Sequence, residues 1–309
     1  MTDVVRNVLT AFRLDRAEPS ELVGGMTNSA WKVQDGALSY VLRRHDRREA
    51  TASQVRSELL WLEVLGSESN VRTPVPVRLA NGSLAPVAEP GPDGDALAFW
   101  TLVSWVDGDT LERLPDAREA GLIGSMLADM HGRARAWRPP PEFDRLTYDA
   151  WLFETSARTL VTHAGEQLTA RARLDLHTAL GLSTVLLERL RRDPEQTGLI
   201  HADIHDGNVV FGGEPRQAGV IDFARFGFGP WALDLAMAMH YLTEDLSVPL
   251  FEAHHSRFIL SPDAERALPN LRFLAAVENL AILSGFPDEA EFVASELPGL
   301  VAQAERLLD

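Results

Sequence analysis

The sequence predicts an α+β protein in which a β-rich N-terminal part precedes a mainly helical C-terminal part. Short runs of β-branched and apolar residues, separated by glycine and aspartate turns, fill most of residues 1–104. Beyond them, apolar residues recur with the three- and four-residue spacing of amphipathic helices. We therefore expect two parts, residues 1–104 with an antiparallel sheet and one packed helix, and residues 105–309 with most of the helices.

The expected elements of the first part follow from local patterns. Apolar residues at helical spacing predict helices over residues 3–13 and 53–65. Apolar stretches between turns predict strands over residues 21–23, 30–34, 38–44 and 98–106. Asp35-Gly36 is typical of the tight turn that joins two antiparallel strands.

The second part is predicted to be helical over residues 117–135, 149–160, 167–192 and 247–308, with a further helix that starts at Trp231. Because proline removes a backbone donor, we expect the last stretch to break at its prolines, which are Pro262, Pro269, Pro287 and Pro298. Gly-Phe-Gly-Pro at residues 227–230 is expected to end an element. The adjacent His254 and His255 are expected at the surface, since neighbouring helical side chains do not converge on a metal.

Composition limits the function. The chain of 309 residues has 45% hydrophobic and 24% charged residues, as is usual for a globular enzyme. Its net charge of −16 disfavours a nucleic-acid partner. The absence of cysteine excludes disulfides and thiolate chemistry. Neither a signal peptide nor a long apolar run is present, so we expect a cytoplasmic protein without a membrane partner, as a monomer or homodimer.

Residues 199–224 carry the strongest chemical signal. They are expected to form strand, polar turn, strand, glycine turn and strand, and to present Asp203, Asn208 and Asp222 together. Each residue alone is an ordinary turn residue. Their order and spacing match a carboxylate that orients an attacking hydroxyl, followed by an amide and a second carboxylate that hold Mg²⁺ on the phosphates of ATP.

These residues carry a resemblance to a known family. His-Ala-Asp-x-His-x-Gly-Asn at residues 201–208, followed by Ile-Asp-Phe at 221–223, resembles the aminoglycoside phosphotransferase superfamily. That superfamily includes choline kinase, homoserine kinase, fructosamine kinase and a bacterial stress-response kinase. The resemblance implies a two-lobed protein-kinase-like fold and ATP-dependent transfer to the hydroxyl of a small, neutral or cationic molecule. Asp203 would be the catalytic residue, with Asn208 and Asp222 as magnesium ligands.

The resemblance also implies a loop over the nucleotide between two N-terminal strands. Backbone amides of a glycine-containing turn can approach phosphate oxygens closely. The expected loop residues are Gly24, Gly25, Thr27, Asn28 and Ser29. The loop lacks the Gly-x-Gly-x-x-Gly pattern, so an ordinary hairpin turn remains the alternative.

Five further residues are implied for the nucleotide site. Strand alternation places Val41 and Arg43 on one face, where Val41 would pack on adenine and Arg43 would replace the usual lysine on the phosphates. Glu58 matches the helix glutamate that pairs with that cation, and a solvated glutamate is the alternative. The backbone of Ser104 and Val106 would contact the adenine edge.

Other residues are expected to support the catalytic turn. Asp234 resembles the aspartate that accepts hydrogen bonds from the turn's backbone, and His201 resembles a packing histidine. His131 matches a histidine that the family buries against the same region. His205 and Asp206 are expected to face solvent, with a place in the lining of the acceptor pocket as the alternative for Asp206.

Two other functions fit the same motifs. A Ser/Thr protein kinase of the stress-response type would replace the acceptor pocket by a shallow groove. A non-catalytic nucleotide-binding protein would be expected to lack Asp203, Asn208 or Asp222, and all three are present. The acceptor, and the choice between ATP and GTP, stay open.

Overall fold

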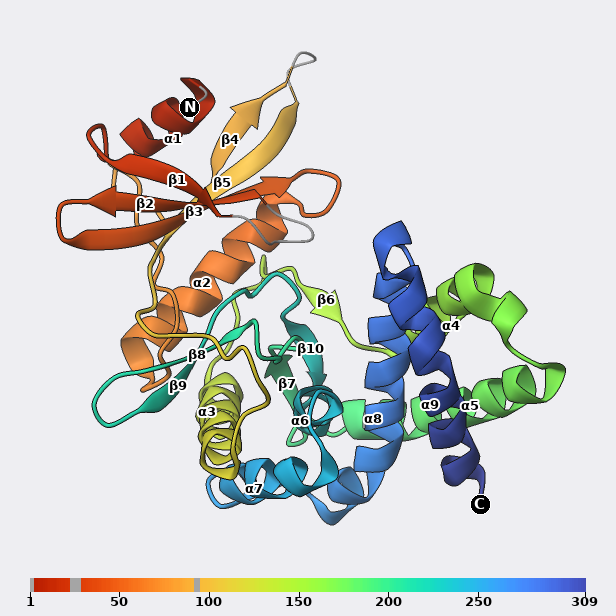
Figure 1. Cartoon of the computed structure of the whole chain (residues 1–309). Helices are drawn as coiled ribbons and strands as arrows, with labels where there is room; N and C mark the ends of the chain where they lie inside the picture. Colours follow the sequence, from red (N-terminus) through yellow and green to blue (C-terminus); the bar gives the residue numbers. More distant parts are fainter. Residues whose placement is uncertain (1–2, 23–28, 92–94) are drawn as a thin grey trace. The chain divides into compact units, whose positions relative to one another are not determined.

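The computed structural model describes residues 3–22, 29–91 and 95–309. The chain divides into two compact units (Figure 1). Unit 1 comprises Met1–Thr110, Arg138–Arg145 and Val209–Ala224, and unit 2 comprises Leu111–Trp137, Leu146–Asn208 and Arg225–Asp309. The predicted α+β class is confirmed. The boundary at residue 104 stays a prediction for the two lobes.

Unit 1 contains a five-stranded antiparallel sheet in the order β1-β2-β3-β5-β4. Its strands are β1 (Glu18–Leu22), β2 (Ser29–Asp35), β3 (Leu38–Asp46), β4 (Val87–Pro90) and β5 (Ala96–Ser104). The Asp35-Gly36 turn joins β2 and β3, with Gly36 at a φ of +59°, so that prediction is confirmed.

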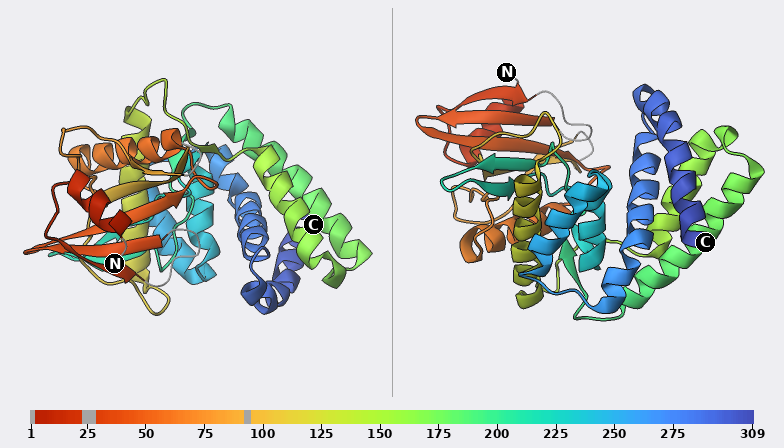
Figure 2. Two further views of the ribbon diagram at one scale, coloured as in Figure 1. Left: turned by 90° about the horizontal axis from the view of Figure 1, so that it is seen from above. Right: turned by 60° about the horizontal axis from the view of Figure 1, so that its bottom comes forward.

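Two helices belong to this sheet. α1 (Asp3–Ala11) buries Leu9 in a core that includes Leu42 of β3 and Trp100 of β5. Because strand residues alternate between faces, Arg43 points to the face opposite Leu42. There it meets α2 (Ala52–Glu68), which starts at a capping box between Thr51 and Gln54 and lies beside the sheet in both views (Figure 2).

Unit 1 also holds the hairpin of β8 (Val209–Gly212) and β9 (Gln217–Val220). Phe211 of β8 exchanges backbone hydrogen bonds with Asp109, at 2.9 and 3.1 Å. This close approach depends on Gly108, whose φ is +135° and whose added Cβ would lie 2.5 Å from the Phe211 carbonyl oxygen. The residue before Asp109 must therefore be glycine.

Unit 2 contains a small sheet in the order β6-β10-β7. Its strands are β6 (Leu146–Thr147), β7 (Thr197–Ile200) and β10 (Gly227–Pro230). Two predictions are therefore wrong. Residues 227–230 form a strand rather than a break, and β7 pairs with β10 rather than extending the β8–β9 hairpin. The glycines of β10 allow it to pair closely with β6, because a Cβ on Gly227 would lie 2.3 Å from the Leu146 carbonyl oxygen.

The helices make up the rest of unit 2. They are α3 (Ala117–Ala136), α4 (Ala150–Ala164), α5 (Ala170–Arg191), α6 (Trp231–His240), α7 (Glu244–His255), α8 (Pro262–Leu283) and α9 (Ala290–Leu308). α8 packs against α4, α5, α6 and α9, and α3 packs against α7 (Figure 1). α8 is thus the central helix of this unit.

The prolines of the last helical stretch act differently from expectation. Pro262 begins α8 and Pro287 begins a short 3₁₀ turn after it, as predicted. Pro269 and Pro298 lie inside α8 and α9, so the predicted breaks there are wrong. Burial of the apolar faces of both helices outweighs the local cost of each proline.

Over the described ranges 3–22, 29–91 and 95–309, none of the helices combines the length and apolar character that a bilayer crossing requires.

Candidate functional site

The catalytic turn of unit 2 begins directly after β7. The Asn208 side-chain amide donates to Asp203 twice, to the backbone carbonyl and to carboxylate Oδ2, each at 3.0 Å. A backbone hydrogen bond of 2.9 Å from Asn208 N to His205 O closes the turn. The five-residue spacing therefore brings two of the three predicted residues into direct contact. Asp222 belongs to unit 1.

The backbone before Asp203 is held by a buried carboxylate. Ala202 has a φ of +62°, which a residue with a Cβ rarely adopts. Asp234 of α6 accepts from His201 N at 2.9 Å and from Ala202 N at 2.8 Å. Burial would raise the pKa of Asp234, but its hydrogen bonds, that from His131 first, outweigh burial and lower the pKa. The predicted support by Asp234 is confirmed.

Histidines pack beneath this turn. His131 Nε2 lies 2.9 Å from Asp234 Oδ2, and both His131 and His201 are fully buried, as expected. His254 was expected at the surface, and that expectation is wrong. Its Nε2 lies 3.0 Å from His131 Nδ1, it is fully buried, and burial lowers its pKa to about 3. α7 packs on α3 with this face inward, which the sequence of one helix does not reveal.

A half-buried cation lies beside Asp203. Arg225 Nη1 is 3.5 Å from Asp203 Oδ1, and Arg225 Nη2 is 2.5 Å from Glu278 Oε1 on α8. Burial alone would lower the pKa of Arg225. The negative charge of Glu278, more than any other group, outweighs burial and raises the pKa above its ordinary value. Burial raises the pKa of Glu278, and the guanidinium opposes that effect. Arg225 is therefore a fixed positive charge next to the candidate base.

A small cavity of about 10 Å³, room for one water molecule, lies at the same place. Its lining includes Asp203, Tyr241, Glu278 and Asn279. The Tyr241 hydroxyl donates to Asn279 Oδ1 at 3.1 Å, and burial raises the Tyr241 pKa, so the hydroxyl stays protonated. Asp206 lies outside this lining, and its side chain is 61% exposed, so it faces solvent as predicted.

In unit 1, Arg43 connects two acids. Its Nη1 donates to Glu58 Oε1 at 3.0 Å, and its Nη2 donates to Asp222 Oδ1 at 2.8 Å. Burial would lower the pKa of Arg43, and the charges of Asp222 and Glu58 outweigh it and raise the pKa. The expected ion pair with Glu58 is present, which excludes the alternative of a solvated glutamate.

The neighbouring His45 stays neutral. It is buried on β3, and its Nε2 lies 3.0 Å from the Thr101 hydroxyl. Burial and then the positive charge of Arg43 lower its pKa to about 3. Arg43 is therefore the charged member of this pair, and its charge is offset by the carboxylates of Glu58 and Asp222.

The nucleotide-loop predictions divide into two sets. Gly24, Gly25, Thr27 and Asn28 lie outside the described residues. Ser29 begins β2 and is exposed. Val41 lies two residues from Arg43 on β3 and is half-buried. Their contact with a nucleotide stays a prediction.

The predicted adenine contacts lie at the end of β5. The Ser104 backbone N–H already donates to Val75 O at 2.7 Å, so only other groups of Ser104 could face adenine. Val106 lies two residues further on and is half-buried. Lys32 does not compete with Arg43 for phosphate, because its Nζ lies 4.2 Å from the centre of the Trp105 ring.

The donor chemistry at Asn208 and Asp222 fits a hard divalent cation, which prefers amide and carboxylate oxygens. The Asn208 amide nitrogen faces Asp203, which leaves its oxygen for another partner. Asp222 keeps a left-handed φ of +59° and a 44% exposed side chain. In the described part of the chain, no cluster of three or more His, Asp or Glu side chains could form a metal site by itself.

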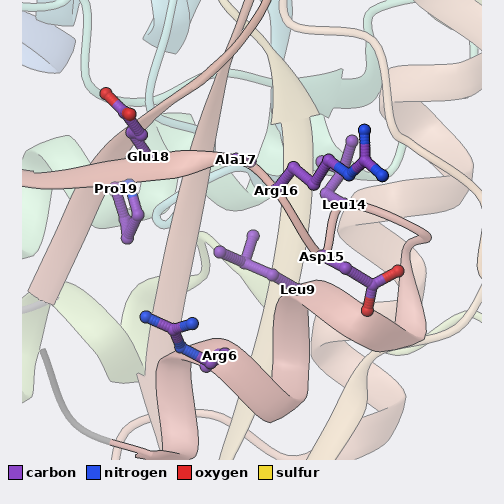
Figure 3. A pocket seen from close by; sticks show the side chains of 8 residues that line it. All are labelled: Arg6, Leu9, Leu14, Asp15, Arg16, Ala17, Glu18 and Pro19. Atoms are coloured by element: carbon purple, nitrogen blue, oxygen red, sulfur yellow. The ribbon is translucent and has the colours of Figure 1, made fainter.

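Two larger cavities lie away from these residues. One of about 370 Å³ is lined by α1 and by the segment that leads into β1, including Arg6, Asp15 and Glu18 (Figure 3). Another of about 550 Å³ lies among α4, α5, α8 and α9. Neither contains a residue predicted for the site, so size alone does not identify the functional cavity.

Sequence reasoning missed Arg225 and Glu278. Arg225 follows Asp-Phe-Ala directly, so a cation three residues after Asp222 is a usable signal. Glu278 interrupts the apolar run Phe-Leu-Ala-Ala-Val-Glu-Asn-Leu-Ala-Ile-Leu at residues 273–283. A lone acid in such a run is expected to be buried with a partner.

Comparisons with known proteins extend over most of the chain. The family model described as "APH: Phosphotransferase enzyme family" matches residues 19–274. The homoserine kinase of Methylorubrum populi is 26% identical over 290 residues, which are 91% of this chain and 83% of that protein.

Solved structures agree with the fold. The microcompartment-associated aminopropanol kinase is 26% identical, with a TM-score of 0.84 over 99% of this chain and 97% of its own. Amicoumacin kinase hAmiN, in complex with AMP-PNP, Ca²⁺ and Ami, is 16% identical, with a TM-score of 0.75 over 92% of this chain and 88% of its own. At that identity the second likeness concerns the fold alone.

Proposed function

The chain belongs to the phosphotransferase enzyme family, and from this premise we propose that it transfers the γ-phosphoryl group of ATP to the hydroxyl of a small amino alcohol. The family match confirms the resemblance that the catalytic turn carried. It also confirms an ATP-dependent phosphotransferase that acts on a hydroxyl group. The acceptor and the residue roles are our proposal.

One observation carries the proposal. The Asp203 carboxylate Oδ2 is fixed by the Asn208 amide at 3.0 Å, and Asp203 lines the small cavity of about 10 Å³. A carboxylate held in this way can orient an alcohol at its remaining oxygen and take the proton late in the reaction. Because the transition state of phosphoryl transfer is loose, positioning and charge supply most of the rate.

The charges around the cavity support a cationic acceptor. Asp203 and Glu278 contribute two negative charges, and Arg225 contributes one positive charge. Tyr241 and Asn279 add neutral hydrogen-bonding groups. Aminopropanol and homoserine, named for two relatives, share an amino group and a hydroxyl on a short chain. An ammonium group matches the negative balance of this cavity.

Three side chains are proposed to act on the phosphates of ATP. Arg43 of unit 1 would donate to phosphate oxygens, since a guanidinium forms paired hydrogen bonds with them. Asn208 and Asp222 would hold a divalent metal, Mg²⁺ in our proposal, which neutralises phosphate charge. Glu58 holds Arg43 in place through the 3.0 Å ion pair.

An acceptor panel tests the proposal. ADP formation is measured with ATP, Mg²⁺ and each of aminopropanol, homoserine, choline, kanamycin and a protein substrate. We expect the highest kcat/KM with a small amino alcohol. Preference for the protein would support a protein kinase instead. ATP binding without ADP formation on any acceptor would support the non-catalytic alternative.

A further inference from the structure

Arg225 lies between two carboxylates and contacts them unequally. Its Nη2 is 2.5 Å from Glu278 Oε1, whereas its Nη1 is 3.5 Å from Asp203 Oδ1. Ion-paired hydrogen bonds between arginine and carboxylate are usually about 2.7–2.9 Å long. The guanidinium is thus fully engaged by Glu278 and only loosely engaged by Asp203.

The backbone of Arg225 is also held in place by a hydrogen bond. The Tyr148 hydroxyl donates to the Arg225 carbonyl at 2.7 Å. The Arg225 side chain is 25% exposed, and that of Glu278 is 8% exposed. The choice between the two carboxylates is therefore made at the tip of the Arg225 side chain.

Glu278 lies on a helix that is packed on several sides. It lies on α8, which packs against four other helices, and it is the charged residue in an apolar stretch of that helix. A buried ion pair adds little net stability, because desolvation of both charges offsets their attraction. Stability alone therefore does not account for an acid at this position.

We propose that Glu278 is a positioning residue that holds Arg225 back from Asp203, so that Asp203 Oδ1 stays available to the acceptor hydroxyl. The proposal rests on the proposed role of Asp203 as the group that orients this hydroxyl. The two oxygens of Asp203 then have separate tasks. Asn208 fixes Oδ2 at 3.0 Å, and Glu278, through Arg225, keeps Oδ1 free of a tight ion pair.

Removing the charge of Glu278 should release the guanidinium. In the structure as described, Asp203 and Glu278 are the carboxylates that pair with Arg225. After Glu278→Gln, Asp203 is the remaining charged partner within reach. Closure of the 3.5 Å contact into a full ion pair would occupy Oδ1 and exclude the alcohol.

A crystallographic comparison tests the geometry without any assay. Crystal structures of the wild type and Glu278→Gln give the distance from the Arg225 guanidinium to Asp203 Oδ1 directly. We expect it to shorten to about 2.8 Å in the variant. An unchanged distance would overturn the proposal, whatever the acceptor is. Absence of transfer to every acceptor would instead contradict the proposed function and leave this measurement valid.

Kinetics with aminopropanol as the probe test the consequence. We expect Glu278→Gln to lower kcat at least tenfold while the KM for ATP stays within twofold. Glu278→Asp keeps a charge for Arg225 and should retain more activity than Glu278→Gln. The double variant Glu278→Gln with Arg225→Met should recover activity, because the competing cation is gone.

The control is Glu265→Gln on the same helix, whose carboxylate pairs with His255 instead. We expect its kcat to stay within twofold of the wild type. A higher KM for aminopropanol at unchanged kcat in Glu278→Gln would mean that Glu278 binds the acceptor itself. A double variant no more active than Glu278→Gln would show that Arg225 does not cause the loss. Either result would overturn the proposal.

Discussion

Charge at single residues is set by partners that lie close in space and far apart in sequence. Arg43 is balanced by Glu58 and Asp222 in unit 1, and Arg225 is balanced by Glu278 in unit 2. Each guanidinium is shared between carboxylates, with Arg43 buried and the Arg225 side chain 25% exposed. Removing one partner therefore leaves a poorly solvated charge without its counter-charge, which costs stability unless another partner is in reach.

Asp203→Asn tests the proposed base. The variant keeps the shape of the side chain and removes its capacity to take a proton. We expect kcat to fall by about 10²–10⁴, with ATP binding retained, because general-base contributions have that size. Activity is measured as ADP release, and ATP affinity by calorimetry.

The matched control is Asp206→Asn in the same turn, whose exposed carboxylate accepts from Gly207 N at 2.9 Å and lies outside the lining of the cavity at Asp203. We expect it to behave as wild type. Unchanged kcat in Asp203→Asn would exclude Asp203 as the base.

Glu58→Gln tests the role of Arg43. Loss of one carboxylate leaves Arg43 paired with Asp222 alone, which draws it toward Asp222. We expect the KM for ATP to rise by about tenfold, since a hydrogen bond to a charged group contributes roughly 1.5–3 kcal/mol. Glu63→Gln on the same helix, where the acid pairs with Arg78 at the surface, is expected to leave the KM unchanged. Equal effects of both variants would contradict a specific role.

At the scale of elements, glycines decide which strands and helices can approach. Gly198 of β7 lies against the ring of Trp231, the first residue of α6. A Cβ on Gly198 would lie 1.8 Å from that ring, and Trp231 is fully buried. The strand that leads into the catalytic turn therefore accepts no side chain at this position.

Gly198→Ala is expected to destabilise the protein by at least about 1–3 kcal/mol, because overpacking forces the ring or the strand to move. The free energy of unfolding is measured in urea. Gly181→Ala on α5 is the control, since its Cβ would meet nothing within 4 Å. It should stabilise the helix by roughly 0.5–1 kcal/mol. A neutral Gly198→Ala would contradict the tight approach of β7 and α6.

For the molecule as a whole, buried histidines link stability to pH. His45 in unit 1 and His254 in unit 2 are buried, and both have a pKa lowered to about 3. In the unfolded chain the pKa of histidine is about 6.5. Above that pH both states are neutral, and the histidines contribute no pH dependence. Below it, the unfolded chain binds protons that the folded protein excludes.

We therefore expect the free energy of unfolding to fall between about pH 6.5 and pH 4, by up to about 1.4 kcal/mol per pH unit for each such histidine. Urea unfolding at several pH values measures the slope. His45→Gln should flatten it, and exposed His163→Gln should not. The same slope in wild type and His45→Gln would contradict the prediction.

The sequence alone determined the parts of this protein that depend on neighbours along the chain. The contact between Asp203 and Asn208 follows from their five-residue spacing within one turn. The face of the sheet on which Arg43 lies follows from the alternation of side chains along one strand. The amphipathic helices follow in the same way. The bounds of the helices predicted over 3–13, 53–65, 117–135, 149–160 and 167–192 lie within a few residues of the observed ones, because periodicity reports which side of an element is buried.

Tertiary structure decided whatever depends on partners distant in sequence. It pairs β7 with β10, buries His254 against His131 and places Glu278 on Arg225. It also carries α8 and α9 through Pro269 and Pro298. The reason is physical. Apolar side chains are buried and strands are paired only when separate elements pack together. The free energy gained in this way outweighs the local conformational preferences of residues such as proline, on which sequence-based predictions depend.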